Sequence, residues 1–306
     1  MRCSTPAAAR RRPASPITTR WSPSSRVRCA VTDGARAARR VRITRLVGGE
    51  RQLARDTLAG EEPLELRVEL AGTVRSVVST MRTPGDDFEL AAGWLAAERI
   101  IAGRHDIAAM RFCSDGADQH YNVLTVSLHR THRALDALAP RSGIASAACG
   151  ICGQAVIDAT LGDVAPLDDA TRLGHAALYQ LPAALRRAQA SFSATGGSHA
   201  AAWFDAGDPA QPRICREDIG RHNAVDKVLG RRLLDGADGR AGVLLVSGRA
   251  GYEIVQKCIV ARVPILCAIS APSSLAVALA RAAGLTLVGF LRDQRANIYS
   301  EPHRLV

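Results

Sequence analysis

The chain has 306 residues, which is long enough for one large domain or two smaller ones with a substantial core. Apolar residues make up 47% and aromatic residues only 4%, and no apolar run approaches the ~18 residues of a membrane span. The formal charge of +11 does not indicate a nucleic-acid-binding surface, because residues 1–45 alone hold twelve Arg and one acid, while the remainder balances 28 basic against 28 acidic residues.

Residues 1–45 form a basic tail of low apolar content, which predicts disorder. The tail lacks the apolar segment of a secretory signal. Its Arg-rich, acid-poor composition is also typical of organelle transit peptides. We favour a non-specific basic arm, or residues that precede the natural start site.

Residues 46–140 are expected to form a smaller α+β subdomain. Residues 64–70 alternate apolar and charged side chains, which predicts a half-buried strand. The elements expected around it are its hairpin partner at 73–80, a turn with a helix N-cap at 83–87, a helix at 88–100 and a strand at 122–128.

Residues 141–306 are expected to form the larger domain. After a helix at about 181–190, apolar runs at 242–246, 264–269 and 285–290 alternate with helical segments at 252–262 and between the cap Ser273 and the terminator Gly284. This β-α-β-α-β order predicts an α/β fold with a parallel sheet and right-handed crossovers.

Polar segments follow each of these three strands. Ser247-Gly248-Arg249 follows the first, residues 270–274 follow the second and residues 291–295 follow the third. Ligands in such sheets bind beyond the strand carboxyl ends. Small hydroxyl residues, helix N-termini and three arginines at one edge favour an anionic ligand such as a phosphate or pyrophosphate.

The segment Cys149-Gly150-Ile151-Cys152-Gly153 holds the only glycine-flanked C-x-x-C. A zinc site needs further ligands, which the chain could supply only across a dimer, and a thioredoxin-type pair lacks its βα context. A structural loop and a reactive thiol remain, and we favour the thiol, because glycine neighbours leave it accessible. The eight cysteines are spread along a chain too large to need disulfides, which favours a reducing cytoplasm.

Three further segments are rich in functional groups. Residues 217–227 carry acids, Arg, His, Asn and Lys in eleven positions, although a solvated amphipathic helix accounts for most charged runs. Residues 195–199 end in Gly-Gly-Ser-His, which fits a turn before a core histidine equally well. Residues 247–253 fit either a tight βα loop or an anion site, and they lack a Walker lysine.

Together these segments resemble the FdhD/NarQ family of formate dehydrogenase accessory sulfurtransferases, from about residue 60 to 305. The resemblance is carried by residues 83–91, 149–153, 195–200, 217–227, 248–257, 270–277 and 289–290. Gly251 stands where that family is expected to have Ser.

The resemblance implies a sulfur carrier that is required for formate dehydrogenase activity. A cysteine desulfurase would load sulfur onto Cys149 as a persulfide, with Cys152 as helper or alternate carrier. The sulfur would then pass to the molybdenum bis(molybdopterin guanine dinucleotide) cofactor, a substrate that a guanine nucleotide mimics in part. The family also implies a cytidine-deaminase-like α/β/α core, a homodimer and a cytoplasmic location, without structural zinc.

The resemblance also implies the residues that bind this cofactor. The main stretch maps onto Phe290, Leu291, Arg292, Asp293, Gln294 and Arg295, and further contacts are expected from Gly197, His199, Arg221, His222, Ser247, Arg249 and Ser273. A base deaminase is the rival enzyme class, but the chain has no H-x-E and Ala148 precedes Cys149. An assembly chaperone with no covalent step is the other alternative.

Overall fold

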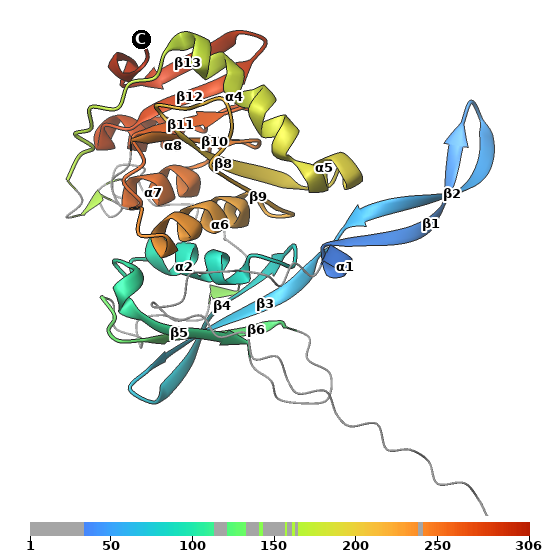
Figure 1. Cartoon of the computed structure of the whole chain (residues 1–306), viewed down its shortest axis with the longest axis horizontal. Coiled ribbons are helices and arrows are strands. Elements are labelled where there is room, and N and C mark those ends of the chain that lie inside the picture. Colours follow the sequence, from blue (N-terminus) through green and yellow to red (C-terminus); the bar gives the residue numbers. More distant parts are fainter. Residues whose placement is uncertain are drawn as a thin grey trace, which may run out of the picture.

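The computed structural model describes residues 34–112, 121–132, 141–142, 157, 161–162, 165–237 and 241–306. Two β-sheets with their helices form two units that meet through helices α2 and α6, and a two-stranded ribbon extends away from both (Figure 1). The fold is therefore mixed α/β, as the sequence predicts.

The first unit is a five-stranded sheet in the order β5-β6-β3-β4-β7. The strand predicted at 64–70 is present and pairs antiparallel with its predicted hairpin partner. Helix α2 is buried along nearly its whole length, because it lies between this sheet and the second unit. The elements are β3 (Glu62–Leu70), β4 (Thr73–Arg82), α2 (Asp87–Ala97), η1 (Arg104–Asp106), β5 (Ile107–Phe112), β6 (Val123–Leu128) and β7 (Arg141–Ser142).

The second unit is a six-stranded sheet in the order β13-β12-β11-β10-β8-β9. Strands β10, β11 and β12 are parallel, which confirms the predicted β-α-β-α-β segment. The elements are α4 (His175–Ala188), α5 (Ala190–Thr195), β8 (His199–Asp205), β9 (Ile214–Asp218), α6 (Arg221–Leu234), β10 (Gly242–Val246), α7 (Tyr252–Val260), β11 (Ile265–Ala268), α8 (Ser274–Ala283), β12 (Thr286–Arg292), β13 (Arg295–Ser300) and η3 (Pro302–Arg304).

Helices cover both faces of the six-stranded sheet. Val243 and Leu245 of β10 pack in the core that α4 covers, whereas Leu244 and Val246 pack in the core that α6, α7 and α8 cover. Successive strand side chains point to opposite faces, so a wholly apolar strand needs cover on both. The central strand β10 is fully buried for this reason.

The helix ends agree with the sequence where caps are strong. Ser273 accepts a hydrogen bond from the backbone N–H of Ala276 and Gly284 ends α8 in the left-handed region, as predicted. Helix α4 instead begins at His175 and continues through Pro182, a residue more typical of a first turn. Among the described residues, the longest helices have 14 residues, and none combines the length and apolar character of a bilayer crossing.

The amino-terminal part differs from the predicted basic tail. Residues 1–33 lie outside the described residues, but residues 34–45 form α1 (Gly34–Ala37) and most of β1 (Ala38–Val47). Strand β1 pairs along its whole length with β2 (Glu50–Ala59), and Figure 1 shows the pair as a projecting arm. Cross-strand pairing orders these residues despite their charge. Strand β7 pairs with β4, so the first unit also extends just past residue 140.

Two glycines bring the units together. A Cβ atom at Gly93 of α2 would overlap the backbone carbonyl of Asp226, and one at Gly230 of α6 would overlap that of Glu89. The two helix backbones therefore touch without intervening side chains. This crossing fixes α6, whose first residues lie at the candidate site.

Candidate functional site

The predicted ligand edge is formed by the ends of several strands. His199 begins β8 opposite Asp218 at the end of β9, and Ala201 of β8 pairs with Val246 at the end of β10. The amino end of β8 therefore lies beside the carboxyl ends of β10, β11 and β12. The structure places the predicted residues of five separate segments at this one edge.

Ser247 and Gly248 shape the centre of the edge. The Ser247 hydroxyl accepts a hydrogen bond from the Ala200 backbone N–H at 2.9 Å, and the Ser247 backbone N–H donates to the Ala200 carbonyl at 2.9 Å. A Cβ atom at Gly248 would lie 3.5 Å from Nδ1 of His199 and 3.5 Å from Cδ of Arg221. The small residue thus admits both side chains to the same space.

Arg221 is the first residue of α6, and its Nε atom is buried without a hydrogen-bond partner among the described residues. A buried guanidinium N–H with no acceptor is costly, because nothing replaces its lost hydration. The position also adds the partial positive charge of a 14-residue helix. An anion at this point would satisfy both the side chain and the helix end.

The two histidines beside Arg221 do not add positive charge at neutral pH. Burial lowers the pKa of His199, and the Arg221 guanidinium lowers it further. Burial also lowers the pKa of His222 to about 4, although Glu253 acts in the opposite direction. Nε2 of His222 lies 3.2 Å from the Glu253 carboxylate. A neutral His222 can donate its ring N–H to that carboxylate and so hold a fixed orientation.

The described residues line a cavity of about 510 Å³ and another of about 480 Å³, and both sizes are typical of ligand sites. The first, about 510 Å³, opens beside His199 and Ser247 at the strand edge. It is lined by Arg186, Gln189, Phe192, Gly196, Gly197, Ser198, His199, Ile219, Ser247 and Ile269. We name it the edge cavity.

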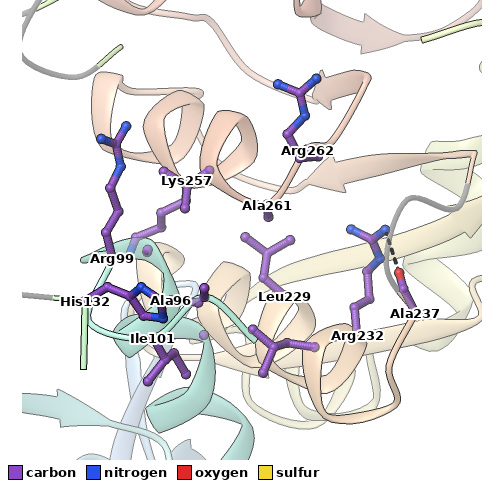
Figure 2. Close-up of a pocket in the computed structure, with 15 residues that line it drawn as sticks. Ala96, Arg99, Ile101, His132, Leu229, Arg232, Ala237, Lys257, Ala261 and Arg262 are labelled. Atoms are coloured by element: carbon purple, nitrogen blue, oxygen red, sulfur yellow. Dashed lines mark hydrogen bonds between the residues drawn. The ribbon is translucent and has the colours of Figure 1, made fainter. Parts of the chain in front are cut away.

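The second cavity, about 480 Å³, lies where α2, α6 and α7 meet (Figure 2). Its basic side chains are engaged with protein groups. Lys257 pairs with Asp226 at 2.8 Å, Arg232 donates to the Ala237 carbonyl at 3.4 Å and lies over the Trp203 ring, and Arg262 donates to the Pro166 carbonyl at 3.1 Å. Arg232 Nε is, like Arg221 Nε, buried without a hydrogen-bond partner among the described residues, but the Arg232 guanidinium lies 3.5 Å from the Trp203 ring centroid, which already engages its charge.

The turn predicted to bind the cofactor follows β12 at the same edge. Phe290 has a φ of 52° beside an irregularity in the β12–β13 pairing, and its backbone N–H donates to the Ser270 carbonyl at 3.1 Å. This bulge leaves Phe290 37% exposed and buries Leu291 completely. The Leu291 side chain therefore packs in the core, and only its backbone is available to a ligand.

The remaining residues of this turn are exposed. Asp293 and Gln294 have φ values of 50° and 57°, as a two-residue hairpin turn requires, and Arg292 and Arg295 flank them. Arg249 is exposed in the loop after β10. Ser273 uses its hydroxyl as the α8 cap, so its side chain has a structural partner already.

The dense segment 217–227 divides between structure and site. Glu217 accepts hydrogen bonds from the backbone N–H groups of Ser191 and Phe192, and Asp218 pairs with the buried Lys227 at 2.8 Å. These acids hold elements together, as the amphipathic-helix interpretation allowed. Within residues 217–227, the predicted site residues Arg221 and His222 lie at the strand edge. The sequence alone does not separate them from Glu217 and Asp218, because the partners of these acids come from other elements.

The predicted sulfur-carrying residues Cys149 and Cys152 lie outside the described residues. Of the described thiols, Cys258 and Cys267 are fully buried, which raises the pKa of each, and burial raises the pKa of Cys215 to about 11. Such thiols are poor nucleophiles because the thiolate is the reactive form. Within the described ranges, no three His, Cys, Asp or Glu side chains gather as a metal site.

Sequence reasoning missed half of the edge cavity. Arg186, Gln189 and Phe192 come from the end of α4 and from α5, and Ile219 and Ile269 follow strands β9 and β11. No motif marks these residues. The only available signal was their position just before residues 195–199, where the resemblance implied Gly197 and His199 as cofactor contacts.

Comparisons with known proteins agree with the resemblance. The model of the FdhD/NarQ family matches residues 59–306. A sulfur carrier protein FdhD from Mycolicibacterium paratuberculosis is 45% identical over 273 residues, covering 87% of this chain and 98% of the relative, and one from Thermoplasma acidophilum is 44% identical over 257 residues, covering 83% and 88%. A crystal structure of a formate dehydrogenase accessory protein from Desulfotalea psychrophila superposes with a TM-score of 0.68 at 26% identity, covering 88% of this chain and 100% of the other.

Proposed function

Because the chain belongs to the FdhD/NarQ family, we propose that it is a sulfur carrier that matures formate dehydrogenase. Its donor is a cysteine desulfurase, and its acceptor is the molybdenum bis(molybdopterin guanine dinucleotide) cofactor, bound as a substrate before insertion. The names of the curated relatives and of the solved neighbour support the sulfur-carrying role and the formate dehydrogenase client.

The covalent chemistry falls to Cys149, with Cys152 as helper. Its thiolate attacks the outer sulfur of the donor's persulfide, so that a new S–S bond forms on Cys149 and the donor leaves as a thiol. The outer sulfur then passes to the metal of the substrate as the S–S bond on Cys149 breaks. The substrate metal supplies the two electrons that reduce this sulfur to sulfide, and Cys149 leaves as a thiolate. The buried thiols Cys258 and Cys267 are unsuited to either step, because burial opposes thiolate formation.

One observation supports the binding half of this proposal most directly: Nε of Arg221 is buried without a hydrogen-bond partner among the described residues, close to His199, which lines the cavity of about 510 Å³. A dinucleotide substrate carries pyrophosphate groups, and a phosphate oxygen is the natural acceptor for a guanidinium N–H at a helix N-terminus. Arg249, Arg292 and Arg295 are exposed on neighbouring loops and can reach further phosphate oxygens.

The direct test is intact mass spectrometry after incubation with a cysteine desulfurase and L-cysteine. The wild-type chain is expected to gain about 32 Da, one sulfur atom, in a form that reductant removes. Cys149→Ala is expected to abolish this gain, whereas Cys152→Ala retains it. No adduct on any variant, with a desulfurase that loads a control acceptor, would contradict the carrier function.

An assembly chaperone without a covalent step is the second candidate, since the edge cavity and Arg221 need no thiol to bind a nucleotide. The double variant Cys149→Ala with Cys152→Ala separates the two functions. A chaperone would still support formate dehydrogenase activity in a strain that lacks the wild-type protein, whereas a sulfur carrier would not. The deaminase-like arrangement, the homodimer and the cytoplasmic location remain parts of the proposal.

A further inference from the structure

Residues 83–91 form a motif of the sequence to which the proposed function gives no role. They lie in the first unit, at the turn between β4 and α2 and along α2, whereas every described residue that lines the edge cavity belongs to the second unit. The side chains of Thr83 and Glu89 nevertheless contact the second unit. Glu89 pairs with Arg216 of β9 at 2.5 Å, and Thr83, only 5% exposed, lies beside the turn that joins β9 to α6. The motif therefore contacts the elements that lead into the site.

Two hydrogen bonds join Thr83 to this turn. Its hydroxyl accepts from the Ile219 backbone N–H at 3.0 Å, and its backbone N–H donates to the Asp218 carboxylate at 3.1 Å. The same carboxylate accepts from the Gly220 backbone N–H at 2.8 Å. Arg221 comes next, as the first residue of α6. The backbone N–H groups of both turn residues are therefore held by Thr83 and Asp218, immediately before the site.

Side chains of α6 complete the network. Lys227 is 1% exposed, pairs with Asp218 at 2.8 Å and donates to the Thr83 carbonyl at 2.9 Å. The Asn223 amide donates to the Asp218 carboxylate at 3.1 Å and to the Met81 carbonyl at 2.8 Å. A buried polar network of satisfied groups is rigid. The first two turns of α6 are therefore tied to the first unit.

The position of Arg221 matters because a hydrogen bond to an anion weakens steeply when its distance and angle change. The Arg221 side chain passes close to Gly248, where a Cβ atom would lie 3.5 Å from its Cδ. Only two residues separate β9 from α6, so a shift of this turn moves the helix end and Arg221 with it. Gly220, the N-cap residue, has no side chain with which to cap α6. The bonds from Thr83 therefore contribute the fixed geometry that a cap would otherwise provide.

We propose that Thr83 is a positioning residue of the anion site: its hydroxyl holds the β9–α6 turn in the conformation that directs Arg221 toward an anionic ligand. The first unit thereby affects binding in the second. This inference rests on the proposed function, which places a phosphate group at Arg221, and adds the residue that orients the guanidinium. It also gives the motif at 83–91 a role that needs no contact with the ligand.

Calorimetric titration of the full chain with inorganic pyrophosphate tests this role. Thr83→Val keeps the branched shape and the backbone groups but removes the acceptor of the Ile219 backbone N–H. We expect pyrophosphate affinity to fall about 5-fold or more, which lies within the range of effects for residues that do not contact the ligand. Thr83→Ser retains the hydroxyl, so its affinity should stay within about two-fold of the wild type.

Thr286→Val is the matched control. Thr286 is fully buried at the end of β12 opposite the ligand edge, and its hydroxyl donates to the Glu301 carbonyl at 2.8 Å. Both valine variants should lose stability in chemical denaturation, because each leaves a buried polar group without its partner. Only Thr83→Val should also weaken pyrophosphate binding. Equal pyrophosphate affinities in the two variants would show that Thr83 has a structural role alone.

A double-mutant cycle tests whether Thr83 acts through Arg221. In the Arg221→Gln background, Thr83→Val should lower pyrophosphate affinity by less than about two-fold, because the group that it positions is already gone. A further loss as large as in the wild-type background would overturn the proposal, since Thr83 would then affect binding by another route.

Amide hydrogen exchange of the wild-type chain tests the same coupling without a variant, and it serves if Thr83→Val does not fold. Coupling between two sites is reciprocal, so bound pyrophosphate should slow exchange of the Ile219 N–H about 5-fold. Unchanged exchange at Ile219, in a chain that binds pyrophosphate, would overturn the proposal, and a chain that does not bind it would overturn the anion site as well. The sulfur adduct on Cys149 is measured separately, so the carrier function is judged on its own result.

Discussion

The strand edge and the interface between the two units use the same kinds of charged residue in opposite ways. At the interface, Lys227 and Asp218 are both buried and lie 2.8 Å apart, and Arg216 pairs with the fully buried Glu89. At the edge, Arg221 has a buried N–H with no partner in the part of the chain that the structure describes, and Arg249 is exposed. Charge density marks both regions, but only the unsatisfied groups indicate a ligand.

The largest effect is expected from breaking the interface. Lys227→Met leaves the Asp218 carboxylate buried without its cation and removes the hydrogen bond to the Thr83 carbonyl. We expect a loss of roughly 3–5 kcal/mol in the free energy of unfolding. Chemical denaturation monitored by circular dichroism measures this loss, and a change below about 1 kcal/mol would place Lys227 outside the stabilising network.

A substitution at the strand edge should leave stability nearly unchanged but weaken ligand binding. Arg221→Gln removes a half-buried guanidinium whose Nε has no hydrogen-bond partner among the described residues, so the free energy of unfolding should stay the same or rise slightly. Pyrophosphate affinity should fall about 10-fold or more, as the loss of a charged hydrogen bond implies. Arg213→Gln is the control, because it removes the same charge beside Asp205 at the opposite edge of the sheet. Equal affinities for the two variants would refute the anion site.

The two regions should also titrate with opposite signs. The pKa of His222 falls to about 4 in the fold, so between pH 4 and 6.5 the unfolded chain binds more protons and stability rises with pH. Burial raises the pKa of Asp226 to about 6, so between pH 4 and 6 the folded chain binds more protons and stability falls as pH rises.

Single variants resolve these two contributions. In denaturation series from pH 4 to 7, His222→Gln should make the slope of stability against pH less positive than in the wild type, and Asp226→Asn should make it more positive. If both variants changed the slope of unfolding free energy against pH in the same direction, the opposite titration of the interface and the edge would be refuted.

The smallest effect is expected at an exposed pair. Arg111 is 44% exposed and lies 2.7 Å from the Glu69 carboxylate on the first sheet. Arg111→Ala should change the free energy of unfolding by about 1 kcal/mol or less, because solvent screens such pairs. A loss comparable to that of Lys227→Met would mean that burial does not separate the two classes of ion pair.

Local signals explain why much of the fold could be predicted. Apolar runs, the Ser273 cap and the Gly284 terminator lie within a few residues of the elements they define, and parallel strands necessarily end at a common edge. That topological rule brought Ser247 and Arg249 to the ligand edge before any side chain was placed. The α/β class and the position of the site followed from it.

Pairings between distant residues explain what the sequence could not provide. The arginines of β1 are ordered by partners in β2, so composition alone suggested a tail. Asp218 and Arg221 are three positions apart, yet Asp218 meets Lys227 in the core, whereas Arg221 lies beside Gly248 at the strand edge. Likewise, Phe192 and Gln189 line the edge cavity at a place where Glu217 of β9 holds the backbone of α5.

The glycine contact between α2 and α6 couples the packing of the two units to the position of Arg221 at the start of α6. Gly230 lies nine residues from Arg221, or about 13 Å along the helix axis at 1.5 Å per residue. A methyl group at Gly230 must push α6 away from the Glu89 carbonyl, and a rigid helix transmits that tilt to its other end. The position of Arg221 at the ligand site therefore depends partly on the absence of a side chain at Gly230, which lies far from the ligand.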